Sequence, residues 1–430
     1  MIQTLTAGDD SPHPAPDSRY DRDAPQPPRP VRVRAGSPEA LLAIVPHLLG
    51  FVPQASLVVI GIEPPDHLIK VTLRYDLPDP PGAGVAADIA AHAVGVIKSQ
   101  RLSALVAVGY GSPVLVDLVA GALGAVAGSA GIDVADILRV EDGRFWSYLC
   151  ANDECCPAAG TPFDPGAQAA GAAAAAMAGT GHAVLADRAA VAARVAPLGG
   201  TAAESMRQAT RRAERHVSQL LAKVRRSARL GAARRMIAAD GVNAVGSMSA
   251  TYRADGRYAT DYQLAWITVA LRDLRVRDDA WARMDPAHLD AHRRLWIDVT
   301  QRAQPGYVAA PASLLAFVAW QAGDGALANV ALDRALADQP RYSMAQLLRQ
   351  VITAGAPPAL ARLPMTPEEV AASYDDADEA DETDEADETD ETNEADEADD
   401  ADETDGVGEA ERYDHESDAD VRDPDPLAEP

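Results

Sequence analysis

The 430-residue chain is long enough for two or three domains, each with its own hydrophobic core. Its formal net charge of −27 is concentrated at one end, because residues 375–430 hold 29 of the 65 acidic residues and only two of the 38 basic ones. Residues 1–374 therefore carry 36 residues of each sign, and the overall charge says nothing about what the folded surface binds.

The composition excludes three classes of protein. Three cysteines are too few for a disulfide framework in a chain of this length. The opening residues lack the apolar stretch of a signal peptide, and no apolar run is long enough to span a membrane. We therefore expect a cytoplasmic protein without a membrane partner.

The N-terminal third combines strand and helix signals. Residues 1–30 are polar and proline-rich, which predicts a disordered tail. Ser37, Pro38 and Glu39 predict the start of a helix that ends at Gly50. The apolar run Leu57–Ile62 predicts a strand buried on both faces, and the alternation over residues 68–75 predicts an antiparallel neighbour.

The same pattern continues to residue 150. A buried strand over residues 103–109 lies between two helices, and Asp142-Gly143 predicts a tight turn between two further strands. Helices alternate with strands, but hairpins interrupt the parallel order. The sequence therefore predicts an α/β domain over residues 31–165 with a mixed sheet of about five or six strands.

Strand signals almost vanish after residue 166. An alanine-rich connection over residues 166–200 leads to a predicted all-α domain over 201–372, and the acidic segment 373–430 is predicted to be disordered. The apolar periodicity predicts a long helix from residue 201 to about 239 and further helices at 260–276, 287–302, 311–322, 325–338 and 342–354. Residues 312–340 have the spacing of one tetratricopeptide-like helical hairpin, with an ordinary antiparallel hairpin as the alternative.

Several segments together resemble one protein family. They are "SPEALLAIVPHLLGFVPQASLVVIGI", "RYDLP", "VAVGYGSP", "RVEDGRFWSYLCANDECCPAAGTPFDP", "LRDLRVRDDAW" and "LLAFVAWQAGDGALANVALDRAL". Over residues 32–358 the chain is similar to the DUF4192 family, an actinobacterial family without an assigned function. The resemblance implies a cytoplasmic protein with this two-part plan, and it implies no activity, cofactor or catalytic residue.

Cys150, Cys155 and Cys156 form the first candidate site, because three soft ligands lie within seven residues at the end of a predicted strand. A closed zinc site needs four ligands, so a zinc ion here would take its fourth ligand from a distant histidine: His47, His67, His92 or His182. A redox pair of Cys150 with Cys155 or Cys156 is a second interpretation. Three small thiols that pack a loop are the third.

Gly109, Tyr110, Gly111 and Ser112 form the second candidate site, between a buried strand and a helix start at Pro113. Free backbone N–H groups at such a junction can bind an anion, and α/β sheets bind ligands at the carboxyl ends of their strands. The G-x-G spacing is also typical of a tight turn that only joins a strand to a helix.

Residues 204–239 form the third candidate, with ten basic and two acidic residues. This Arg-rich segment could bind nucleic-acid phosphates or the acidic tail of the chain, or it could be a solvated helix face. The pairs Arg272-Asp273 and Arg277-Asp278 suit ion pairs or helix caps. Without a catalytic signature, we expect a non-enzymatic interaction or regulatory protein with a protein partner at the helical domain. The alternative is an enzyme that binds a small molecule at residues 109–113.

Overall fold

The computed structural model describes the chain in sections, and each statement below concerns these sections. They are residues 2–5, 32–65, 68–164, 167, 171, 174–175, 183–225, 230–254, 259–358 and 365–375. The predicted tails 1–30 and 373–430 lie outside this description except for Ile2–Leu5 and residues 373–375.

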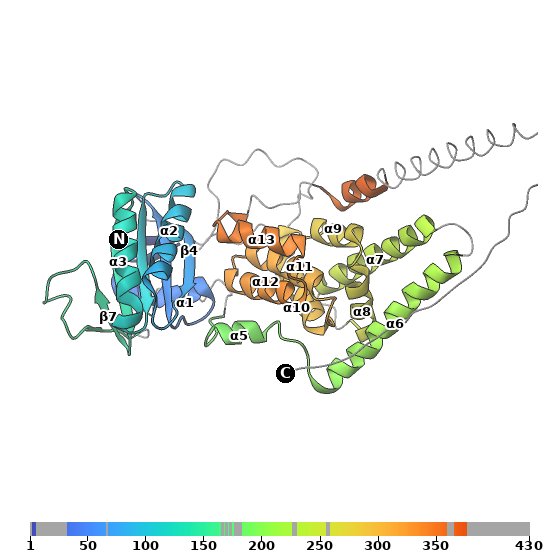
Figure 1. Ribbon diagram of the computed structural model, residues 1–430, viewed down its shortest axis with the longest axis horizontal. Coiled ribbons are helices and arrows are strands. Elements are labelled where there is room, and N and C mark those ends of the chain that lie inside the picture. Colours follow the sequence, from blue (N-terminus) through green and yellow to red (C-terminus); the bar gives the residue numbers. More distant parts are fainter. Residues whose placement is uncertain are drawn as a thin grey trace, which may run out of the picture. The chain divides into compact units, whose positions relative to one another are not determined.

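A mixed eight-stranded sheet forms the N-terminal part (Figure 1). Its strand order is β2-β1-β4-β3-β5-β6-β7-β8. The strands are β1 (Ile2–Leu5), β2 (Arg32–Ala35), β3 (Ser56–Glu63), β4 (Leu68–Asp76), β5 (Ala104–Tyr110), β6 (Asp133–Glu141), β7 (Arg144–Ser147) and β8 (Thr161–Pro162). Six of them lie within residues 32–150, so the predicted mixed α/β fold is confirmed.

Two short strands were not predicted. β1 lies inside the segment that composition assigns to a tail, and it pairs antiparallel with β2 and parallel with β4. β8 pairs with β7 through only two residue positions. Neither segment is long enough to show the alternation by which a strand is recognised in a sequence.

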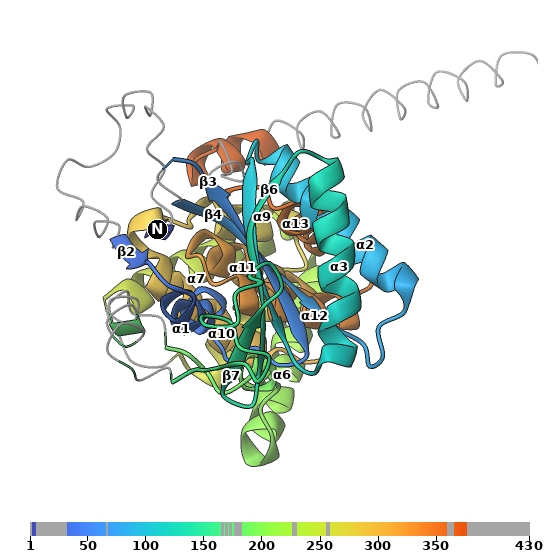
Figure 2. The same cartoon turned by 90° about the vertical axis from the view of Figure 1, so that its left-hand side faces the viewer.

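Alternate residues of β3 pack against helices on opposite faces of the sheet. Leu57 and Val59 belong to the core formed with α2 (Ala83–Ser99) and α3 (Pro113–Ser129). Val58 and Ile60 belong to the core formed with α1 (Pro38–Leu49). Figure 2 shows α1 on one side of the sheet, with α2 and α3 on the other. This double burial explains the uninterrupted apolar sequence of the strand.

The expected helix signals act at α1. The Ser37 hydroxyl accepts a hydrogen bond from the backbone N–H of Ala40 at 3.3 Å, and Pro38 occupies the first helical turn. Gly50 ends the helix with φ +75°. At the turn that follows, Leu185 of the connecting segment forms a bridge with Phe51.

Helices make up the described part of the chain after residue 187. They are α5 (Arg188–Ala193), α6 (Gly200–Arg225), α7 (Leu230–Arg253), α8 (Asp261–Ala270), α9 (Leu274–Ala282), the 3-10 turn η1 (Pro286–His288), α10 (Leu289–Arg302), α11 (Ala309–Gln321), α12 (Gly325–Asp338), α13 (Ser343–Thr353) and a last helix over residues 367–375. None of the helices described is both long and apolar enough to cross a bilayer.

The prediction of one helix from residue 201 to 239 is wrong, because α6 and α7 are separate helices (Figure 1). α6 packs mainly against α8, α7 packs against α8, α9 and α10, and α6 and α7 also pack against each other. One straight helix could not make the contact between α6 and α7. Residues 226–229, between the two helices, lie outside the description.

The predicted helix 260–276 is also two helices. The Asp273 carboxylate accepts a hydrogen bond from the backbone N–H of Arg275 at 2.9 Å, and this cap starts α9. Arg277 forms an ion pair with Asp278 at 2.6 Å. The two Arg-Asp pairs therefore contain a helix cap and an ion pair, as their sequence suggested.

α11 lies at the centre of the helical part. Every residue from Ala309 to Trp320 is buried. α11 packs against α9, α10, α12 and α13. The Asp338 carboxylate, at the end of α12, accepts hydrogen bonds from the backbone N–H groups of Gly306, Val308 and Ala309 at 2.7, 3.0 and 3.2 Å. A side chain distant in sequence thus caps α11.

Candidate functional site

The three thiols gather on the loop that joins β7 to β8. The Sγ atoms of Cys150 and Cys155 lie 3.2 Å apart, and those of Cys155 and Cys156 lie 3.8 Å apart. All three Sγ atoms lie within 4.8 Å of one another. Among the residues described, no other group of three His, Cys, Asp or Glu side chains brings its ligand atoms this close.

Hydrogen bonds to the sheet fix the first half of this loop. The Ser147 hydroxyl donates to Asp136 of β6 at 2.7 Å and accepts from the backbone N–H of Cys150 at 3.0 Å. The carbonyl of Asn152 then accepts from the N–H groups of Cys155 and Cys156 at 3.2 and 2.8 Å. This turn brings the last two cysteines back toward Cys150.

Trp146 fixes the second half of the loop. Its indole N–H donates to the carbonyl of Ala158 at 3.1 Å, and the Arg139 guanidinium lies 3.7 Å from the centre of its ring. Arg144 donates to the carbonyl of Gly160 at 2.8 Å, and the Thr161 hydroxyl donates to the carbonyl of Cys155 at 3.3 Å. Protein hydrogen bonds therefore hold both halves of the loop.

The thiols differ in acidity because they interact with one another. Hydrogen bonds from Cys156, from the backbone of Asn152 and from Cys155 lower the pKa of Cys150. The hydrogen bond to Cys150, with some burial, raises the pKa of Cys156 to about 12, and the bond to Cys150 also raises the pKa of Cys155. The three thiols are therefore not equivalent, and Cys150 is the most acidic of them.

The spacing of the sulfur atoms suits a tetrahedral metal ion. Zinc–sulfur bonds of about 2.3 Å place two ligand sulfurs about 3.8 Å apart. Cys155 and Cys156 already have this separation, and Cys150 would move away from Cys155 by roughly half an ångström. Cys155 is exposed and the other two are half-buried, so an ion could reach the group from solvent.

The suggested fourth ligand does not come from His47 or His92. Neither belongs to the thiol group, and the Nδ1 atom of His92 shares a hydrogen bond with the Tyr75 hydroxyl at 2.7 Å. His67 and His182 lie outside the described residues. The three thiols therefore offer three positions of a tetrahedron and leave one for a water molecule or another ligand.

The second candidate site, Gly109 to Ser112, is a closely packed turn between β5 and α3. A Cβ atom at Gly109 would lie 2.2 Å from Val116, so glycine allows α3 to approach the strand. Gly111 has φ +139°, and its N–H donates to the carbonyl of Val140 at 2.9 Å. Ser112 precedes Pro113 at the start of α3, but its hydroxyl makes no capping hydrogen bond.

Tyr110 does not join the other three residues at this junction. It packs with the α1 core, on the sheet face opposite to the one that Gly109 presents to α3. Its hydroxyl is buried without a hydrogen-bond partner among the residues described, and burial raises the pKa of this phenol. The four residues therefore lie in two separate environments.

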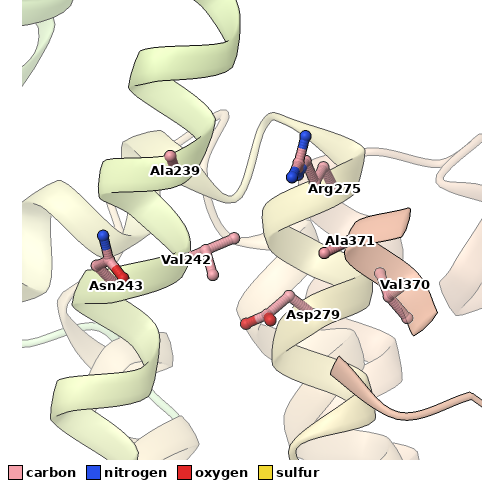
Figure 3. A pocket seen from close by; sticks show the side chains of 7 residues that line it. All are labelled: Ala239, Val242, Asn243, Arg275, Asp279, Val370 and Ala371. Carbon is pink, nitrogen blue, oxygen red and sulfur yellow. The ribbon is translucent and has the colours of Figure 1, made fainter. Parts of the chain in front are cut away.

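The helical part contains a small pocket that the sequence did not indicate (Figure 3). Its volume is about 120 Å³, and it is lined by Ala239, Val242 and Asn243 of α7, Arg275 and Asp279 of α9, and Val370 and Ala371. Asp279 is 3% exposed and forms two hydrogen bonds with Arg283, at 2.6 and 2.9 Å; burial raises its pKa. Pockets for organic ligands are usually about 300 Å³ or larger, so this one suits only a few water molecules.

The Arg-rich segment has a partly exposed basic face. Arg207, Arg211 and Arg215 of α6 are exposed and spaced four residues apart. Arg207 and Arg211 share the Glu204 carboxylate, at 2.5 and 3.9 Å. The side chains of Lys223, Arg225, Arg226 and Arg229 lie outside the described residues.

No curated protein and no solved structure matches this chain. Residues 38–359 match the family described as "Domain of unknown function (DUF4192)". The match covers well over half of the chain, including the sheet from α1 onward, the thiol loop and the helices to α13. The chain therefore belongs to the DUF4192 family.

Proposed function

We propose that this protein is a non-enzymatic regulatory protein that binds a soft metal ion, with Zn²⁺ as the first candidate, through Cys150, Cys155 and Cys156. The observation that carries the proposal is the approach of the three Sγ atoms to within 4.8 Å of one another. Thiolate ligands favour zinc and other soft ions over magnesium or calcium, which bind oxygen.

The way the loop is held supports a regulatory role. Hydrogen bonds to Ser147, Asn152 and Ala158 hold the loop along its length. A loop that is held at both ends by hydrogen bonds can gain and lose an ion without unfolding of the domain, unlike a zinc finger, which folds only with its metal. Three ligands also leave one coordination position for exchange with solvent or a partner.

The helical part is the proposed surface for a protein partner. α11 and α12 form a hairpin with tetratricopeptide-like spacing, and α13 presents Leu347 with 61% of its surface exposed. The proposed compartment is the cytoplasm of an actinobacterium, where thiols stay reduced and able to bind metal.

Elemental analysis tests the metal site directly. The protein is purified without a His-tag, loaded with Zn²⁺ and passed through a desalting column. We expect about one zinc per chain, as one tetrahedral site predicts. The proposal would be overturned by less than a tenth of that amount, together with a zinc-binding dye that reports the same free zinc with and without the protein.

Variants identify the ligands in the same assay. Cys150→Ser, Cys155→Ser and Cys156→Ser should each lose most of the bound zinc, whereas His92→Asn should keep it. When Co²⁺ replaces Zn²⁺ in this assay, a cobalt–thiolate absorption band can come only from this loop, because the chain has only three cysteines. Zinc that persists in all three serine variants would place the metal elsewhere.

A further inference from the structure

We infer that Cys150 and Cys155 are a peroxide-sensitive pair, and that their disulfide removes two of the three thiolates from the metal site. The carrying observation is the 3.2 Å between their Sγ atoms. A disulfide bond is about 2.05 Å long, so the two sulfurs must approach by only about 1.2 Å. The predicted loss of the metal rests on the proposed function, but the predicted disulfide does not.

Geometry selects Cys155 rather than Cys156 as the partner of Cys150. Cys155 is the exposed thiol and has the short contact with Cys150. The 3.8 Å between Cys155 and Cys156 joins neighbours in the chain, whose disulfide would close a strained ring across one peptide unit. Cys156 is left as the reduced third thiol.

The reaction balances with hydrogen peroxide as the oxidant. The Cys150 thiolate attacks one peroxide oxygen; an S–O bond forms, the O–O bond breaks, and hydroxide leaves and takes a proton to become water. The Cys155 thiol then gives up its proton and attacks the Cys150 sulfur; an S–S bond forms, the S–O bond breaks, and hydroxide leaves and takes that proton to become the second water. Two thiols lose two electrons in total, and peroxide is reduced to two water molecules.

The loop can accept this change because its anchors lie outside the pair. Ser147 binds the backbone N–H of Cys150, and Thr161 binds the backbone carbonyl of Cys155, so neither contact uses a sulfur atom. The disulfide therefore forms by side-chain rotation within a loop that is already closed. With one thiolate left, the site can no longer hold an ion that needs three protein ligands.

The first test uses the full-length chain stripped of metal with a chelator. It is treated with one equivalent of hydrogen peroxide, alkylated and cleaved after glutamate. Glu154 lies between Cys150 and Cys155, so a bond from Cys150 to either later cysteine joins two peptides, whereas a Cys155–Cys156 bond does not. We expect the joined peptides, a loss of two alkylation sites, and full reversal by a dithiol reductant.

Two variants identify the partner. Cys156→Ser should form the joined peptides at the wild-type rate, and Cys155→Ser should form them at least tenfold more slowly. Equal rates in Cys155→Ser and the wild type would overturn the assignment of Cys155. Three thiols that stay fully alkylatable, or that go directly to sulfinic acid, would overturn the disulfide itself.

A second measurement separates this inference from the proposed function. The zinc-loaded chain is treated with peroxide beside a zinc-binding dye, and we expect one zinc to be released for each disulfide formed. Disulfide formation in a chain that never binds zinc would remove only the metal proposal. Zinc binding that persists after the disulfide has formed would remove the link between oxidation and release.

Discussion

Gly160 lies against the indole ring of Trp146, and a Cβ atom at Gly160 would be only 2.5 Å from that ring. Gly160 also has φ +77°, a conformation that side chains other than glycine rarely adopt. These two features close the second half of the thiol loop on Trp146, whose other contacts are to Ala158 and Arg139. The spacing of the cysteines therefore depends on Gly160, which is not itself a metal ligand.

Gly160→Ala should weaken zinc binding. The added methyl group must displace Trp146 or the loop, and we expect the affinity to fall by roughly tenfold, as for other changes in the support of a metal site. The affinity is measured by competition with a chromophoric chelator. Gly131→Ala is the matched control, because Gly131 has φ +70° and no atom within 4 Å of its Cβ position. An equal fall in both variants would mean that contact with Trp146 is irrelevant.

Ser147→Ala should also weaken zinc binding without changing the fold. The hydroxyl joins Asp136 to the backbone N–H of Cys150, and its loss frees the first ligand of the loop. We expect about a tenfold loss of affinity in the same competition assay. Ser129→Ala serves as the control, since Ser129 lies at the exposed end of α3. An unchanged affinity in Ser147→Ala would show that the loop does not need this anchor.

His292 should make the protein less stable in mild acid. It is 1% exposed, and its Nε2 atom has no hydrogen-bond partner among the described residues. Burial, aided by Arg253 and His288 and opposed by Asp285, lowers its pKa from 6.5 to about 4. Between these two values the unfolded chain binds a proton that the folded chain does not, so stability falls as the pH falls from 6.5 toward 4.

The expected size of the effect is about 2 kcal/mol between pH 7.5 and pH 5. The measurement is urea unfolding of wild type and His292→Gln at several pH values. The difference between their two pH dependences isolates His292, because the titration of the other groups cancels. His92→Gln is the control, because His92 lies in α2, is partly exposed and does not contribute to the pKa of His292. Equal pH dependence in wild type and His292→Gln would show that His292 does not cause the effect.

Deletion of residues 375–430 should increase binding to heparin at low salt. The segment carries a net charge of −27 and is tethered to the chain that bears Arg207, Arg211 and Arg215 on α6. A tethered anion competes at an effective concentration on the order of millimolar, and physiological salt screens it over about 8 Å. The salt concentration that elutes the protein should therefore rise after deletion, and replacement of the three arginines by glutamine should reverse the gain. If the eluting salt concentration did not change after deletion, the acidic segment would not compete with heparin for these arginines.

Local signals in the sequence predicted most of the α/β part. Ser37 and Pro38 begin α1, and the apolar run Leu57–Ile62 lies in a strand with helices on both faces. Such signals act within a few residues and need no knowledge of distant partners. Sequence reasoning also selected Cys150, Cys155 and Cys156, because soft ligands close in sequence are rarely far apart in space.

The remaining features depend on contacts between distant residues. The closeness of the thiols depends on Ser147, the Asn152 turn, Trp146 and Gly160, which carry no metal-ligand motif that a sequence search could show. The separation of α6 from α7 is seen in the packing of these two helices against each other and against α8. Asp338 caps α11 across about thirty residues, and a search for caps next to the helix could not have found it.

The complete burial of α11 distinguishes this helical part from a repeat array. In an array each unit contacts only its neighbours, so the ends can fray while the middle persists. Here one helix touches partners that precede and follow it in the chain, from α9 to α13. Withdrawal of α11 would expose all of them at once, so its backbone amides should exchange with deuterium only when the whole helical part unfolds.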